Sequence, residues 1–356
     1  MVYFFKDITP DQYHLLGGKG ASLARMTAAS FPVPIGFCIT TDAFQLFMEE
    51  AGVKSKIMEH LECIDCKNTS ELEEKSALIR ELILQAPMPD TILKAISAAY
   101  QQLCDYCNAN NDLPVAVRSS ATAEDLPDAS FAGQQDTYLW VVGTEDVLAF
   151  TKKCWASLYT ARAINYRFDH QIAENDVMMS VVVQKMVNAR TAGVAMTLNP
   201  INGDRSKIVI DASWGLGEAV VSGEVTPDNF LVDKVMLEVL KANIQNKSVE
   251  HIPDRTLKRV ITREVAPEKA SQPSLTDDEI KEICRIAKKI EKHYGGPQDI
   301  EWAIDADLPE GQNITLLQSR PETVWSQKKD SAPASIKTGM EGILNTLMNP
   351  LSNKKS

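Results

Sequence analysis

The stretch Gln298-Asp-Ile-Glu-Trp-Ala-Ile-Asp-Ala-Asp-Leu-Pro-Glu-Gly-Gln-Asn-Ile-Thr-Leu-Leu-Gln-Ser-Arg-Pro321 consists of two apolar runs on either side of a polar segment that contains Pro and Gly. Runs of this length with a turn between them are typical of two consecutive strands. We therefore expect strands over residues 299–304 and 313–318, lying side by side in one sheet.

Four polar side chains of this stretch are suited to binding a metal ion and phosphate. Side chains two residues apart share one face of a strand, so Asp299 and Glu301 are expected on the same face. Pairing of the two strands would bring Glu301 next to Gln318, with Arg320 beside them. Mg²⁺ prefers carboxylate and amide oxygens, and arginine binds phosphate oxygens. The stretch therefore predicts Glu301 and Gln318 as metal ligands beside a phosphate-binding arginine.

Three earlier segments have the composition of a phosphate-binding site. Gly17-Gly-Lys-Gly20 precedes an expected helix start but lacks the Walker A spacing, so an ordinary turn explains it equally well on its own. Arg118 lies in the strand-like run Val115–Ser120, where it either faces a ligand or makes a surface ion pair. The long loop 121–135 contains Gly133, which permits close approach of backbone to phosphate.

Composition limits the class of protein. The chain has 356 residues, of which 44% are hydrophobic and 24% charged, the ordinary balance of a soluble globular protein. Its formal net charge is −11 and it has no long basic run, which argues against a nucleic-acid partner. No apolar run is long enough for a membrane span, and the N-terminus does not have the pattern of a secretory signal. We expect a cytoplasmic protein with no membrane partner.

The seven cysteines include two C-x-x-C pairs, Cys63 with Cys66 and Cys104 with Cys107. Four thiolates could bind zinc, but the gap between the pairs is about twice that of a typical zinc ribbon. Both pairs lie in segments with helical composition, where cysteines three residues apart share a buried face. Structural thiols are the favoured interpretation, and zinc binding is the alternative.

The distribution of elements predicts a mixed α+β protein. Residues 41–111 are mostly helical in pattern, and a further helix is expected over 277–293 with Thr276 as its N-cap. The second half adds several strand-like runs, over residues 177–186, 192–197, 207–212 and 229–235. From residue 326 to 356 the chain is a polar linker followed by a short amphipathic stretch.

Six short motifs occur in a characteristic order, namely Gly17-Gly-Lys-Gly-Ala-Ser-Leu23, Val117-Arg-Ser-Ser-Ala121, Phe131-Ala-Gly-Gln134, Gly215-Leu-Gly-Glu218, Gln298-Asp-Ile-Glu-Trp302 and Leu317-Gln-Ser-Arg-Pro321. Together they resemble the ATP-binding domain shared by phosphoenolpyruvate synthase (pyruvate, water dikinase), pyruvate phosphate dikinase and rifampicin phosphotransferase. The resemblance covers residues 10–325, about nine-tenths of the chain.

The resemblance implies an ATP-grasp-like α+β fold in which two lobes close on the nucleotide. Residues 1–183 would form the N-terminal lobe, 184–325 the C-terminal lobe, and 326–356 a linker and tail. The cofactors implied are ATP and Mg²⁺. The residues implied to bind them are Lys19, Arg118 and Arg320 on the phosphates, Gly133 and Thr137 in the closing loop, Gln184 at the adenine hinge, Glu218 near the ribose or metal, and Glu301 and Gln318 on Mg²⁺.

Members of this family pass the β-phosphoryl group of ATP to a histidine on a mobile swivel domain and release AMP. The five histidines of this chain are His14, His60, His170, His251 and His293, and none has the Thr-Ser-His-like context of that residue. We therefore expect the phosphorylated histidine and the acceptor-binding site on a separate partner subunit.

Several functions fit these expectations. The favoured one is the ATP-binding subunit of a split dikinase that phosphorylates phenol, similar to phenylphosphate synthase. The alternatives are an N-terminal fragment of phosphoenolpyruvate synthase, a nucleotide-binding protein without transfer chemistry, and an ATP-grasp ligase.

Overall fold

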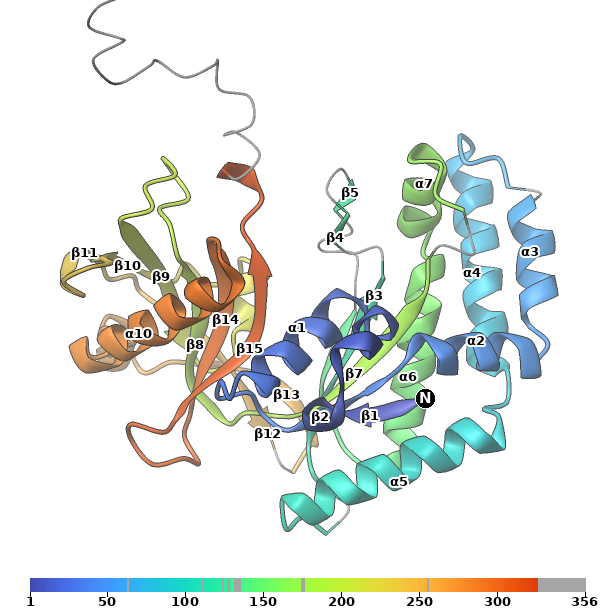
Figure 1. Cartoon of the computed structure of the whole chain (residues 1–356), viewed down its shortest axis with the longest axis horizontal. Coiled ribbons are helices and arrows are strands. Elements are labelled where there is room, and N and C mark those ends of the chain that lie inside the picture. Colours follow the sequence, from blue (N-terminus) through green and yellow to red (C-terminus); the bar gives the residue numbers. More distant parts are fainter. Residues whose placement is uncertain are drawn as a thin grey trace, which may run out of the picture.

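The structure is a computed structural model that describes residues 1–325 except residues 63, 111, 123–124, 127–128, 131–135, 174–176 and 255. The predictions about the 326–356 tail, Gly133 and Cys63 lie outside the described residues. The described part mixes helices with two large antiparallel sheets, as expected for an α+β protein (Figure 1).

The first sheet, called the N-terminal sheet, has five strands in the order β1-β2-β7-β3-β6. Their bounds are β1 Val2–Phe4, β2 Gly36–Ile39, β7 Met179–Lys185, β3 Val115–Ala121 and β6 Thr137–Val141. β7 is central and is made almost entirely of buried residues, because it pairs on both edges and is covered by helices.

Six helices pack around this sheet and make the right-hand part of Figure 1. They are α2 Thr41–Glu50, α3 Lys54–Glu62, α4 Thr69–Gln85, α5 Asp90–Tyr106, α6 Thr144–Ala156 and α7 Ala161–Asp169. Their apolar faces share one core with the sheet, in which the rings of Phe47 and Trp155 lie 4.8 Å apart.

The second sheet, called the C-terminal sheet, has six strands in the order β11-β10-β9-β8-β14-β15. Their bounds are β8 Ala189–Met196, β9 Lys207–Trp214, β10 Asp228–Asp233, β11 Val239–Asn243, β14 Gln298–Asp305 and β15 Ile314–Pro321. Helix α10 (Asp277–Tyr294) covers one face with an apolar stripe. The expected Thr276 cap is confirmed, because Thr276 and Glu279 form a capping box.

Helix α1 (Gly17–Ala28) is early in the chain but packs between the two sheets. Its buried Leu23 and Met26 belong to the core of the C-terminal sheet, and the hydroxyl of Ser22 donates to the carbonyl of Ser319 at 2.6 Å. Helix α1 also contacts β3 and β7 of the N-terminal sheet. It therefore links the strand that carries Arg118 to the strand that carries Gln318.

Short elements complete the described chain. A hairpin joins β12 (Val249–Asp254) to β13 (Arg259–Glu264), and a two-stranded piece joins β4 (Asp125–Leu126) to β5 (Ala129–Ser130). Two one-turn helices, α8 Glu218–Val221 and α9 Pro267–Ala270, and three 3₁₀ turns, η1 Phe5–Asp7, η2 Pro10–Leu15 and η3 Ser157–Tyr159, fill the connections.

The strands expected over 299–304 and 313–318 are confirmed as β14 and β15, and the helix expected over 277–293 is confirmed as α10. The predicted lobe boundary between residues 183 and 184 falls inside β7, which ends at Lys185. The short strand β1 was not predicted, because its pairing with β2 is non-local and leaves little local signal.

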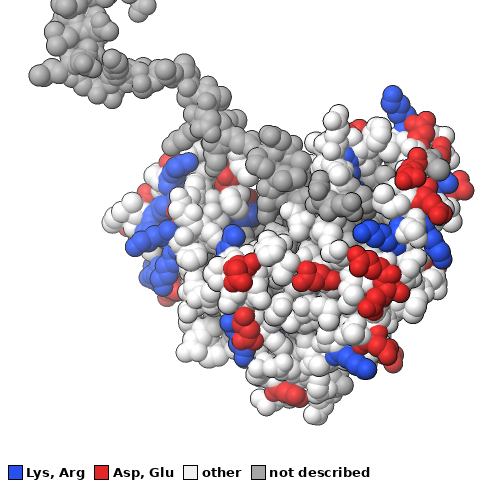
Figure 2. Space-filling view, turned by 45° about the vertical axis from the view of Figure 1, so that its right-hand side comes forward, with Lys and Arg blue, Asp and Glu red and all other residues white. Residues whose placement is uncertain are grey.

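None of the described helices is both long enough and apolar enough to cross a bilayer. On the face shown in Figure 2, basic side chains gather at the left edge, while acidic side chains lie across the centre and right.

Candidate functional site

A cavity of about 530 Å³ lies between the N-terminal and C-terminal sheets. Its volume falls within the usual range of ligand sites, about 300–1,000 Å³. Eight of the nine residues expected to bind nucleotide or metal line it, namely Lys19, Arg118, Thr137, Gln184, Glu218, Glu301, Gln318 and Arg320. The ninth, Gly133, lies outside the described residues. The structure thus brings together residues that the sequence places in six separate segments.

The glycine-rich segment rests directly on the end of β3. Gly17 has φ +64°, and a Cβ there would lie 2.2 Å from the carbonyl oxygen of Ser120, so only glycine fits. The Ser120 hydroxyl accepts from the backbone N–H of Gly20 at 3.1 Å and donates to the carbonyl of Leu16 at 2.8 Å. These contacts fix the start of α1 and bring Lys19, in its first turn, to the cavity.

Arg118 crosses from the N-terminal sheet to the C-terminal sheet. Its Nη2 donates to Oε2 of Glu301 at 3.2 Å and to Oε1 of Gln318 at 2.9 Å, and its Nη1 donates to the carbonyl of Leu317 at 3.0 Å. Glu301 and Gln318 are direct cross-strand partners, so the predicted pairing is present. The register shifts next to this pair, so Leu317 is an extra residue of β15 whose carbonyl faces Arg118.

Asp299 also lines the cavity, although the resemblance assigns it no role. It is the cross-strand partner of Arg320, whose Nε lies 3.5 Å from Oδ2 of Asp299. Burial raises the pKa of Asp299, and the nearby guanidinium of Arg320 opposes that shift. The signal for Asp299 was its position two residues before Glu301 on the same face of one strand.

The other end of the cavity is apolar. Buried apolar side chains line it, namely Ala116 of β3, Met186 and Val187 between β7 and β8, Leu216 after β9, and Ala303 of β14. Gln184 lies beside this end and is only 2% exposed, and its amide donates to the carbonyl of Pro34 at 3.2 Å. The cavity therefore has one apolar end and one charged end.

Glu218 lies at the rim, at the start of α8, where half of its side chain is exposed. Its Oε2 is 3.8 Å from Nδ1 of His251, a buried residue of β12. The other ring nitrogen of His251 lies 2.9 Å from the carboxylate of Glu224, although neither nitrogen makes a hydrogen bond of good geometry. His251 therefore lies between the carboxylates of Glu218 and Glu224.

The prediction that each C-x-x-C pair shares a buried helical face is wrong for Cys66, which is half-buried in a turn after α3, while Cys104 is buried in α5 and the half-buried Cys107 follows the last residue of α5. Cys38, Cys104, Cys154 and Cys284 are buried, and burial raises the pKa of the Cys284 thiol to about 12. Among the described residues, no group of three or more His, Cys, Asp or Glu side chains could hold a metal ion. Zinc binding by both C-x-x-C pairs stays a prediction, because Cys63 is outside that set.

Comparison with known proteins decides the family. Residues 13–340 match the family described as the pyruvate phosphate dikinase AMP/ATP-binding domain. The chain belongs to this family. It is 43% identical to a probable phosphoenolpyruvate synthase of Staphylothermus marinus and 43% identical to the phosphoenolpyruvate synthase of Aeropyrum pernix, covering 96% and 94% of this chain. The predicted resemblance to the phosphoenolpyruvate synthase and pyruvate phosphate dikinase family is confirmed.

The match accounts for only part of each relative. The chain spans 43% of the Staphylothermus marinus protein and 44% of the Aeropyrum pernix protein. A solved structure from Pyrococcus horikoshii Ot3 matches with a TM-score of 0.30 and 14% identity, over 70% of this chain and 100% of that chain. The ATP-grasp-like fold therefore stays a prediction.

Proposed function

We propose that this chain is the ATP-binding part of a dikinase of the phosphoenolpyruvate synthase type. ATP, with Mg²⁺, binds in the cavity between the sheets, and the two sheets belong to the two lobes of an ATP-grasp-like fold. The observation that carries the proposal is the convergence of eight expected residues on one cavity. Short motifs can resemble those of a family without lying close together in space, whereas the residues of a nucleotide site must line one cavity.

The polarity of the cavity fits ATP. The apolar end beside Gln184 suits the adenine ring, which packs between apolar side chains and bonds to backbone groups. The opposite end carries three cationic side chains, Lys19, Arg118 and Arg320, which suit the phosphates. Glu218, half exposed at the rim, has the position and chemistry to bind the ribose hydroxyls.

The residues at the charged end also fit Mg²⁺. Oε2 of Glu301 and Oε1 of Gln318 converge on a single positively charged nitrogen of Arg118, so both oxygens already surround a cation. Oxygen ligands of this kind are those that Mg²⁺ prefers, and Asp299 adds a second carboxylate. When bound, the metal would neutralise charge on the phosphates, and the arginines would orient the phosphoryl group for transfer.

The reaction proposed is attack of a histidine ring nitrogen on the β-phosphorus of ATP, which breaks the bond to AMP. Water then cleaves off the γ-phosphate, so that the histidine keeps the β-phosphoryl group and AMP and phosphate are released. That histidine would lie in the portion that the relatives have beyond the matched region, either on the same polypeptide or on a partner subunit. The relatives are named phosphoenolpyruvate synthases, which favours pyruvate over phenol as the final acceptor. The comparisons lend the phenylphosphate synthase interpretation no support, so it stays a prediction.

The decisive experiment follows labelled phosphate. ATP labelled at the β-phosphate is incubated with Mg²⁺ and the chain together with the protein portion that carries the histidine. We expect acid-labile label on a histidine, formed at the same rate as AMP. Tight ATP binding with label that never leaves the nucleotide would contradict phosphoryl transfer and favour a nucleotide-binding protein.

Arg118 is expected to exclude Mg²⁺ until ATP binds. Its guanidinium occupies the oxygens of Glu301 and Gln318, so the metal can bind them only after Arg118 turns toward the phosphates. Arg118→Met should therefore bind Mg²⁺ alone about tenfold more tightly than the unmodified protein, and bind ATP more weakly, since hydrogen bonds to charged groups are worth about 1.5–3 kcal/mol. Calorimetric titration with Mg²⁺ and with ATP measures both effects.

The matched control for this variant is Arg190→Met. Arg190 also pairs with a carboxylate, that of Glu279, but does not line the cavity. The control should bind both Mg²⁺ and ATP like the unmodified protein. Equal Mg²⁺ affinity of the unmodified protein and Arg118→Met would show that Arg118 does not occupy the metal position.

A further inference from the structure

A second cavity, of about 290 Å³, lies among the helices of the N-terminal sheet. It is lined by side chains from α2, α3, η3 and the segment before β7, and shares no lining residue with the cavity between the sheets. Its volume is close to the lower end of the usual range of ligand sites. A molecule bound here would therefore be small and would not overlap with the nucleotide.

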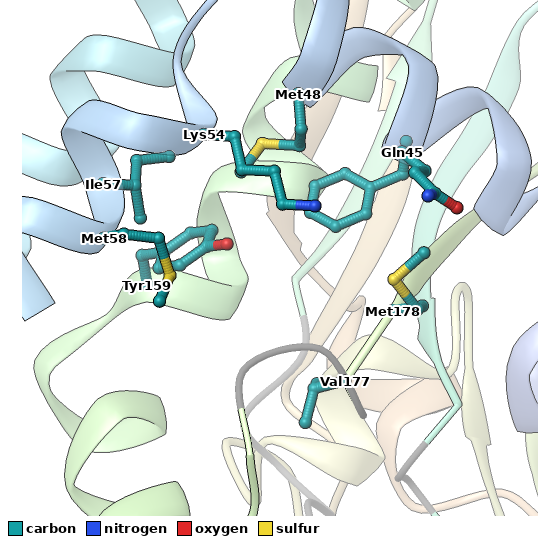
Figure 3. Close-up of a pocket in the computed structure, with 9 residues that line it drawn as sticks. Gln45, Met48, Lys54, Ile57, Met58, Tyr159, Val177 and Met178 are labelled. Atoms are coloured by element: carbon teal, nitrogen blue, oxygen red, sulfur yellow. The ribbon is translucent and has the colours of Figure 1, made fainter.

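Most of the wall is apolar and adaptable. Phe44 and Met48 lie one turn apart on α2, and Ile57 and Met58 are adjacent on α3. Met178 closes the wall from the side of β7 (Figure 3). Methionine side chains are flexible and polarisable, so they adjust to the shape of an apolar ligand. The wall thus suits a hydrocarbon or aromatic body.

The wall is also held in place from the side of the N-terminal sheet. The carbonyl of Met178 accepts from the N–H of Thr122 at 3.0 Å and from its hydroxyl at 3.3 Å. The N–H of Met178 donates to the same hydroxyl at 3.1 Å. Thr122 directly follows β3, so the backbone of Met178 is held to the N-terminal sheet while its side chain can still adjust.

One cation faces the apolar wall. Lys54 begins α3 and lines the cavity with an exposed side chain, and among the described residues it forms no ion pair or hydrogen bond. Figure 3 shows the amine of Lys54 and the hydroxyl of Tyr159 both directed toward the middle of the cavity, with Met58 and Met178 on opposite sides. The amide of Gln45 is a third polar group, at the exposed edge, where it donates to the carboxylate of Glu49 at 3.2 Å.

We propose that this cavity is a binding site for a small amphipathic carboxylate. Its carboxylate pairs with Lys54, and its apolar body packs against the methionine-rich wall. A ligand with a cationic head would be repelled by the positive charge of Lys54. A purely polar anion would make no apolar contacts with the methionine-rich wall. A small monocarboxylate with a hydrocarbon or aromatic body is the class that satisfies both ends.

The test uses octanoate as the probe and methyl-labelled methionine as the reporter. The chain has 12 methionines, three of which line this cavity. Titration with octanoate should shift the methyl signals of Met48, Met58 and Met178 in the NMR spectrum. The signal of Met26, buried in the core of the C-terminal sheet, should stay in place. Absence of shifts at millimolar octanoate, or shifts confined to other methionines, would overturn the proposal.

Variants separate the carboxylate from the apolar body. Lys54→Met should weaken octanoate about two- to fivefold, as expected for loss of an ion pair with an exposed lysine. The same variant should bind octan-1-ol like the unmodified protein, and Lys56→Met, an exposed neighbour on α3, should bind octanoate unchanged. Unaltered octanoate affinity in Lys54→Met would show that the site does not recognise carboxylates.

A third variant blocks the cavity without touching the core. Gln45 is exposed, so Gln45→Trp should fill the mouth while the thermal unfolding midpoint and the ATP affinity stay unchanged. Octanoate should then no longer shift the three methyl signals. Octanoate binding that persists in Gln45→Trp would place the ligand elsewhere and overturn the assignment.

Discussion

Glu301→Gln is expected to slow Mg²⁺-dependent phosphoryl transfer about 100- to 1000-fold while the protein stays folded. The substitution keeps the size of the side chain but removes the negative charge that, with Gln318, surrounds Nη2 of Arg118. Mg²⁺ would lose its charged ligand, and Arg118 would lose its ionic partner. The measurement is the rate of AMP formation from ATP and Mg²⁺ in the presence of the histidine-bearing portion.

The matched control for Glu301→Gln is Glu310→Gln in the same hairpin. Glu310 is exposed in the turn between β14 and β15 and does not line the cavity. Its variant should form AMP at the unmodified rate. AMP formation by Glu301→Gln within a few-fold of that rate would show that Glu301 is not part of the phosphate and metal site.

Asp228→Ala is expected to lower the free energy of unfolding by about 3–5 kcal/mol, because it leaves a buried charge without its partner. Asp228 and Lys247 are fully buried, and Oδ1 of Asp228 lies 2.7 Å from Nζ of Lys247. Asp228 also accepts from the N–H of Gln245 and from both the N–H and the hydroxyl of Ser274. Urea unfolding monitored by tryptophan fluorescence measures the loss.

Two further variants test this interpretation of the buried pair. Lys247→Met should cost less than Asp228→Ala, because the carboxylate of Asp228 keeps three donors. Without Asp228, the amine of Lys247 keeps one acceptor among the described residues, the carbonyl of Gln245. Asp278→Ala removes an exposed pair with Lys281 and should cost at most about 0.5 kcal/mol. Equal losses for Asp228→Ala and Asp278→Ala would show that burial of the pair adds nothing.

Local patterns in the sequence were sufficient for several elements. The alternation of Asp299, Ile300 and Glu301 predicts a strand, and the apolar period after Thr276 predicts α10 together with its cap. Both depend on residues a few positions apart, where side-chain direction and capping follow from the backbone geometry of one element. The same reasoning predicted that Glu301 meets Gln318, because a short turn joins their strands.

The tertiary structure alone decided how the segments meet. Arg118 reaches Glu301 from the other sheet because α1 packs against β3 and β15 together, burying Leu23 and Met26. The carbonyl of Leu317 faces Arg118 because the register between β14 and β15 shifts at this point, and the local sequence does not predict that shift.

The sequence by itself therefore determined the strand pair, the α10 helix and the types of residue suited to bind phosphate and metal. Packing between distant segments forms both the cavity between the two sheets and the second cavity beside Lys54. The reason is physical. Strand alternation and capping act within one element, whereas contacts between distant segments form only when whole apolar faces are buried against each other.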